Sequence, residues 1–181
     1  MKHHTINRNF LRVLTCALAV VAFTICVPKA MTADFTYVTN NNAITITGYN
    51  GSGGTVSIPA DLDGFPVTGI QANVFAANAA ITNVIIPAGV TNIGNGAFLN
   101  CPNLTRATLP GNVSYDNIPP AYYFYQVVFG QSPVASLTIA DGSPFISHEA
   151  FNGVTSLTSV TIPSSVSSIQ YNAFALCLGL T

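Results

Sequence analysis

The chain has 181 residues, 49% of them apolar and only 6% charged, and its five basic and six acidic side chains give a formal net charge of -1. Four of the five basic residues lie within positions 1–30, whereas all six acidic residues follow position 33. The sequence from residue 34 onward therefore carries one arginine against six acids. Such a surface cannot neutralise a phosphate backbone or attract anionic lipid, which excludes binding to nucleic acid and electrostatic binding to a membrane.

The N-terminal segment has the pattern of a secretory signal. Basic residues occupy positions 1–12, and the 15 residues from Val13 to Val27 carry no charge before Pro28 and Lys29. A helix of that length spans roughly 22 Å, less than the ~30 Å hydrocarbon core of a bilayer, so cleavage is favoured over an uncleaved anchor. We predict a signal peptide over residues 1–33, no membrane segment beyond it, and a secreted or cell-surface location.

The next segment has the pattern of a β-hairpin. Residues 35–38 and 44–47 alternate apolar and polar side chains on either side of Asn40-Asn41-Asn42, and residues 49–54 are rich in turn-forming glycine. We predict a hairpin over residues 34–54 that caps the rest of the chain.

Residues 55–181 contain an internal repeat. Five short segments with the pattern apolar-x-apolar recur at spacings of 28, 23, 30 and 23 residues, four of them ending in proline. They divide the chain into units at about 55–82, 83–105, 106–135, 136–158 and 159–181, the third of which is irregular and longer. In four units an isoleucine is followed by phenylalanine five positions later and an apolar residue six beyond that: Ile70/Phe75/Ile81, Ile93/Phe98/Leu104, Ile146/Phe151/Leu157 and Ile169/Phe174/Leu180.

Each unit reads as a short strand, a stop, a second extended piece and a short helical turn with an alanine-phenylalanine pair. One unit has too few apolar side chains to fold alone, whereas stacked units bury one another's faces and pair their strands. The sequence therefore predicts a β-rich, leucine-rich-repeat-like solenoid with a parallel sheet along one side and a hairpin cap.

The units share the pattern IP-x-x-V-x-x-I-x-x-x-AF-x-x-C-x-x-L-T, clearest in residues 86–105 and 162–181. This pattern resembles the BspA-type leucine-rich repeats of secreted and surface proteins, mostly bacterial, and the resemblance extends over residues 34–181 except in the third unit. It implies a non-enzymatic protein, without cofactor or catalytic residues, that acts in adhesion or protein binding. The alternative is a passive structural or spacer component of the cell envelope, or a piece of a longer array, without a specific ligand.

Candidates for chemistry along the chain are few. Cys101 and Cys177 occupy the same repeat position three units apart, about 14 Å at ~4.8 Å per unit, which exceeds the ~7 Å Cα separation that a disulfide allows. We expect both to be reduced and buried. His148 is the only histidine after residue 33 and has no matching nucleophile, and residues 61–64 lack the later ligands of a calcium loop and read better as a hairpin turn. We therefore expect neither catalysis nor a metal or cofactor.

The solvent side of the predicted sheet is one candidate binding surface. The alternation of the strands places outward side chains in two adjacent columns, although threonine and serine also simply suit an exposed strand face. The expected columns are Thr55, Asn83, Arg106, Ser136 and Ser159, beside Ser57, Ile85, Thr108, Thr138 and Thr161.

The irregular unit is the second candidate. Residues 111–133 hold four of the seven tyrosines, and rigid amphipathic rings are typical of recognition sites. In the alternative interpretation the tyrosines cover a wider unit while Phe124 with Val128 or Phe129 replaces the alanine-phenylalanine pair. The residues predicted to bind are Tyr115, Tyr122, Tyr123, Tyr125 and Phe129.

The last unit has no following unit to cover its apolar side chains, among them Val160, Ile162, Ile169 and Phe174. Uncovered ends of a solenoid expose apolar area and an unpaired strand edge. We expect the chain to self-associate through this end, in addition to binding an unidentified protein or surface macromolecule.

Overall fold

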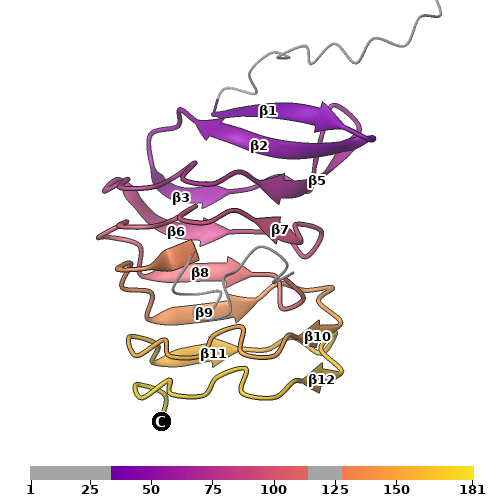
Figure 1. The fold of residues 1–181 in the computed structure, drawn as a ribbon. Helices are drawn as coiled ribbons and strands as arrows, with labels where there is room; N and C mark the ends of the chain where they lie inside the picture. Colours follow the sequence, from indigo (N-terminus) through magenta and orange to yellow (C-terminus); the bar gives the residue numbers. More distant parts are fainter. Residues whose placement is uncertain (1–33, 114–127) are drawn as a thin grey trace, which may run out of the picture.

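The computed structural model describes residues 34–113 and 128–181. Within these residues, twelve strands stack into an elongated column in which successive repeats lie one below the other (Figure 1). The N-terminal hairpin lies at one end of the column and residue 181 at the other.

The capping hairpin consists of β1 (Phe35–Asn40) and β2 (Ala43–Tyr49), which pair antiparallel. Asn41 and Asn42 connect them with φ values of 48° and 61°. Two left-handed residues in a two-residue loop match the twist of the flanking strands, and asparagine tolerates this conformation better than most residues. The predicted hairpin is confirmed, and β2 joins it to the array by pairing parallel with β5 (Phe65–Ile70).

A second hairpin accounts for the insertion in the first repeat. Strand β4 (Asp61–Leu62) pairs antiparallel with β5 through a turn in which Asp63 and Gly64 have φ values of 51° and 81°. The hydroxyl of Tyr37 donates a hydrogen bond to Asp63 Oδ2 at 2.8 Å, which ties this turn to the capping hairpin. The interpretation of residues 61–64 as a hairpin turn is confirmed.

A five-stranded parallel sheet runs along one side of the column, in the order β11-β9-β8-β6-β3. Each strand is the apolar-x-apolar segment of one repeat, so the predicted solenoid with a parallel sheet is confirmed. The strands are β3 (Gly54–Ser57), β6 (Ile81–Ile85), β8 (Arg106–Leu109), β9 (Ser136–Ile139) and β11 (Ser159–Thr161).

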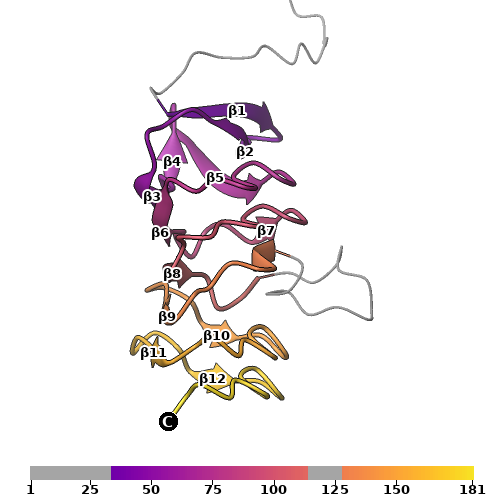
Figure 2. The same ribbon diagram turned by 90° about the vertical axis from the view of Figure 1, so that its left-hand side faces the viewer.

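In the first, second, fourth and fifth repeats, the second extended piece forms short parallel pairs on another side of the column (Figure 2). Strand β7 (Asn92–Ile93) pairs with β5, and β10 (Phe145–Ile146) pairs with β12 (Ser168–Ile169). Ile70, Ile93 and Ile146 point inward from these strands and are buried. The core thus lies between the long sheet and these pairs.

Phenylalanine rings stack along the axis of the column. The rings of Phe75 and Phe98 lie 4.7 Å apart between centroids and nearly parallel, at 3°. Phe151 and Phe174 repeat the arrangement at 5.3 Å. One ring per repeat at a constant position therefore forms an aromatic column that spans successive rungs.

Left-handed residues flank these phenylalanines two positions before and two positions after. Asn73 and Ala77 surround Phe75 with φ values of 60° and 57°, and Asn172 and Leu176 surround Phe174 with 56° and 59°. Each left-handed residue turns the chain back, so the alanine-phenylalanine segments are tight turns and not continuous helix. These turns let the regular repeats close within 23 residues.

The predicted signal peptide, residues 1–33, lies outside the described residues. In the part of the chain that the structure describes, no helix has the length and apolar character needed to cross a membrane.

Candidate functional site: the outer face of the parallel sheet

The register of the parallel strands brings the predicted columns together. Asn83 pairs with Thr55 on one side and with Arg106 on the other, while Ile85 pairs with Ser57 and Thr108. The pairing continues through β9 and β11, so every position predicted for the two columns lies where the sequence placed it. We call these ten side chains the sheet face: Thr55, Asn83, Arg106, Ser136 and Ser159, with Ser57, Ile85, Thr108, Thr138 and Thr161.

The outward side chains form straight columns because the inward side chains of the same strands fix the register. Val84, Ala107 and Leu137 are buried beneath the face and pair with one another in adjacent strands. A shift of one residue would turn these apolar side chains outward, which fixes the register. The core therefore determines where each polar side chain of the sheet face stands.

Hydroxyl groups dominate the sheet face, and most of them are free to bind. Asn83 Nδ2 donates to Thr55 Oγ1 at 3.4 Å. Among the described residues the serine and threonine hydroxyls of the face, other than that of Thr55, make no further hydrogen bond to a side chain. Ile85 is 36% exposed and supplies the apolar side chain of the face.

Arg106 gives the face its charge. It stands in the middle strand and is exposed, and it is the only lysine or arginine after residue 33. Within the described residues it makes no ion pair. Its guanidinium therefore offers five donors to an incoming acceptor, with the Asn83 amide on one neighbouring strand and the Ser136 hydroxyl on the other.

The tyrosines of the irregular unit, Tyr115, Tyr122, Tyr123 and Tyr125, lie outside the described residues, as does Phe124. Phe129 is described, and its assignment to a binding surface is wrong. Its ring is fully buried and stacks on Phe98 at 5.0 Å, because it holds the phenylalanine position of the repeat.

Cys101 and Cys177 are buried and free, in agreement with the expected packing role. The Cys101 Sγ donates to the Phe75 carbonyl at 3.1 Å, and the Cys177 Sγ donates to the Phe151 carbonyl at 3.0 Å. Burial raises the pKa of both thiols, and low thiolate content disfavours nucleophilic or metal-binding roles. Each thiol thus links its rung to the preceding one.

In the irregular repeat, Ser132 occupies the position that cysteine holds in the second and fifth repeats. We did not predict this role from the sequence. The Ser132 Oγ donates to the Phe98 carbonyl at 2.7 Å and accepts from the Cys101 backbone N–H at 3.0 Å. The signal was available, since Ser132 follows Phe129 by three positions, as Cys101 follows Phe98. The extra length of the unit concealed this register.

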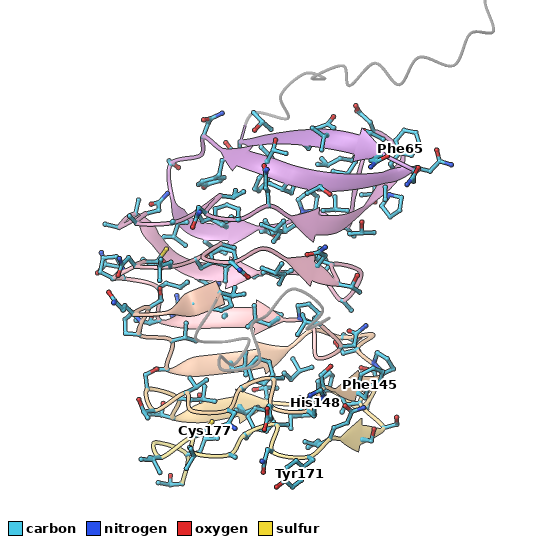
Figure 3. All side chains as sticks on the ribbon, viewed as in Figure 1. Phe65, Phe145, His148, Tyr171 and Cys177 are labelled. Atoms are coloured by element: carbon cyan, nitrogen blue, oxygen red, sulfur yellow. The ribbon has the colours of Figure 1, made fainter. Side chains whose placement is uncertain are left out.

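The remaining candidates from the sequence are His148 and the possible metal ligands. His148 is exposed beside β10 (Figure 3), and its backbone N–H donates to Gln170 Oε1 at 3.0 Å. No group of three or more His, Cys, Asp or Glu side chains in the described ranges could hold a metal ion. An open groove of about 360 Å³ is lined by small and uncharged residues of two neighbouring turns, 130–133 and 153–156.

The stacked repeats, the lengthwise parallel sheet and the single phenylalanine per rung define a solenoid of the leucine-rich-repeat class. A model of the BspA type leucine rich repeat region matches in six copies, over residues 55–125 and 122–181. The chain therefore belongs to this family. The match includes the irregular unit.

The chain is also similar to solved structures of other leucine-rich repeat proteins. A leucine rich repeat protein of T. pallidum is 27% identical with a TM-score of 0.56, over 84% of this chain and 69% of that one. A leucine rich cell surface protein of Faecalibacterium prausnitzii is 28% identical (TM-score 0.45; 81% of this chain, 45% of that one). A leucine-rich repeat protein of Bacteroides ovatus is 21% identical (TM-score 0.46; 83% and 51%). The chain spans about half the length of the last two, and no curated protein matches it.

Proposed function

We propose that the chain is a non-enzymatic, secreted or cell-surface protein that binds another protein through the sheet face. The observation that carries the proposal is the register of five parallel strands, which sets ten outward side chains in two straight columns. Export rests on the signal pattern of residues 1–33, and membership of the BspA-type family supports a role in binding or adhesion.

The shape and chemistry of the face favour a protein surface as the partner. The sheet face lies along the side of the column, and it combines seven hydroxyl groups with one amide, one guanidinium and one isoleucine. A broad array of this kind suits an extended surface better than a small molecule, which needs a concave pocket. Arg106 and Ile85 lie on adjacent strands near its centre. Arginine is enriched in protein interfaces, and Ile85 offers an apolar contact beside it.

The tyrosines at 115, 122, 123 and 125 remain a second predicted contact region, independent of the sheet face. The competing function is a passive spacer, in which serine and threonine serve only to solvate the strands. Altering the sheet face should weaken binding if the chain is a binding protein, and should have no such effect if it is a passive spacer.

The test selects binders from a displayed protein library against the immobilised full chain, and then measures the selected clones on variants. Ile85→Glu and Arg106→Glu change exposed side chains of the face, and Ser168→Glu adds the same charge to the exposed surface of β12 as a control. We expect most clones to lose at least tenfold in affinity on the first two variants and to bind the control unchanged. Clones spread evenly over other surfaces would favour the spacer.

A further inference from the structure

Most of the sheet face repeats itself along the column, and only two of its strands depart from the repetition. In β3, β9 and β11 both outward side chains are serine or threonine. Neighbouring strands lie about 4.8 Å apart, so a partner shifted by one strand from β9 to β11 meets the same hydroxyl groups. The departures lie on β6 and β8, and they are Asn83, Ile85 and Arg106. Only these three side chains can hold a partner at one position along the column.

Arg106 is the only positive charge on the sheet face, and the same five strands contain no acid to neutralise it. In the described residues all acidic side chains lie outside the long sheet, in the two hairpins and in turns: Asp34, Asp61, Asp63, Asp141 and Glu149. An acidic protein is therefore attracted to the sheet face and repelled by the other charged groups of the described surface.

A partner that covers the sheet face also covers Arg106, because β8 is the middle strand of the five. The side chains beside Arg106 on the neighbouring strands are the Asn83 amide and the Ser136 hydroxyl, and both are uncharged. A guanidinium that is removed from water without an opposite charge is strongly destabilising, since neutral acceptors replace only part of its hydration. The compensating negative charge must therefore come from the partner.

We infer that the partner of the sheet face presents an aspartate or glutamate carboxylate to the Arg106 guanidinium, with an apolar side chain beside it on Ile85. This inference rests on the proposed function and adds the chemistry of the partner. A carboxylate fits the guanidinium with two parallel hydrogen bonds, whereas a polyanion such as nucleic acid needs many cations. Ile85 lies diagonally across from Arg106 on the next strand, where an apolar contact keeps water from the ion pair.

The experiment uses clones selected on the immobilised full chain from a displayed protein library, and keeps those that bind Ile85→Ser at least tenfold more weakly. This variant identifies clones on the sheet face by an apolar contact, without a change of charge. In each of these clones, the aspartates and glutamates of the binding surface are changed singly to the amide and to lysine.

Affinities are measured on the unmodified chain and on three variants. Arg106→Gln removes the positive charge, and Arg106→Glu reverses it. Ser159→Glu is the matched control, because it adds a negative charge at an exposed position of the same column, two strands away. Arg106 is exposed, so its variants should keep the fold, which circular dichroism checks.

We expect each sheet-face clone to contain one carboxylate whose change to the amide weakens binding to the unmodified chain at least tenfold. The same change should have little further effect on Arg106→Gln, because the two groups act as a pair. The lysine version of the clone should bind Arg106→Glu at least tenfold more tightly than the original clone does, with no such gain on Ser159→Glu. Added salt should weaken binding to the unmodified chain more than binding to Arg106→Gln.

Sheet-face clones without such a carboxylate would overturn the inference and leave the proposed function standing. Losses that multiply independently on Arg106→Gln would do the same. An equal gain of the lysine version on Ser159→Glu would also overturn it, because Arg106 would then not fix the position of the partner. Clones that all bind Ile85→Ser unchanged would overturn the proposed function, and this inference with it.

Discussion

Single residues in the turns carry a conformational cost that the sequence pattern alone does not reveal. Ala77 has a φ of 57°, at a repeat position that Asn100 and Gly153 also hold in the left-handed region. This conformation costs a residue with a Cβ atom roughly 1–2 kcal/mol of free energy, and glycine avoids that cost. Ala77→Gly should therefore raise the free energy of unfolding by about 1 kcal/mol, measured by urea denaturation.

Ala79 provides the matched control for that change. It is exposed in the same turn region, but its φ is not positive. Ala79→Gly should lower the free energy of unfolding by roughly 0.5–1 kcal/mol, because glycine gains more freedom in the unfolded chain. Two shifts of the same sign would contradict the assignment of strain to Ala77.

Ser132 tests whether one side chain joins the irregular rung to the rung before it. Its hydroxyl satisfies the Phe98 carbonyl and the Cys101 N–H, both within the core. Ser132→Ala should cost about 1–3 kcal/mol of unfolding free energy, because it leaves two buried polar groups without a partner. Ser132→Cys should cost less, since Cys101 and Cys177 make the equivalent bond at this repeat position. A larger loss for cysteine than for alanine would refute this role.

At the scale of elements, a phenylalanine of the column should contribute most to the free energy of unfolding where other rings stack on both of its faces. Phe98 lies between Phe75 and Phe129 and is fully buried, whereas Phe174 stacks on Phe151 and is half-buried. Phe98→Ala should therefore lower the free energy of unfolding by about 3–5 kcal/mol, and Phe174→Ala by clearly less. Urea denaturation of both variants gives the comparison.

Should Phe98→Ala fail to fold, Phe98→Leu and Phe174→Leu retain most of the buried volume and preserve the ranking. Equal losses at the two positions would show that stacking along the column contributes little beyond burial of each ring.

The strands and their register were predictable because alternation and spacing are local properties. Val84 and Leu137 recur in an unbroken inward pattern, so Ile85 and Thr138 had to face outward. Phe129 had two interpretations and Ser132 was not predicted, because the third unit is longer than its neighbours and the length difference concealed its register. The left-handed conformation of Ala77 was also not predictable from the sequence, since alanine carries no signal for positive φ.

At the scale of the whole molecule, each rung contacts only its neighbours. Removal of one whole rung should therefore let the remaining strands pair in the same register. Residues 136–158 and 159–181 have equal length, and β8 pairs with β9 as β9 pairs with β11. Deletion of residues 136–158 would set residues 159–181 directly against the irregular rung. The shortened chain should fold cooperatively with a lower free energy of unfolding, because stability in a solenoid is a sum over rungs and their interfaces.

Several hydrogen bonds at the new junction change, among them the bond from the Ala140 N–H to the Leu109 carbonyl, because Pro163 stands at the equivalent position; the bond of Ser143 can be restored. Ser143 Oγ accepts a hydrogen bond from the buried Gly111 N–H at 3.0 Å, and Val166 stands at the equivalent position of the last repeat. The deletion should therefore be made with Val166→Ser, which restores an acceptor there. Circular dichroism and urea denaturation then compare it with a deletion of residues 136–147, which removes half a repeat. The half-repeat deletion should unfold the C-terminal part of the column, because it places turn residues opposite strand β8; equal stability of the two deletions would show that register does not hold the array together.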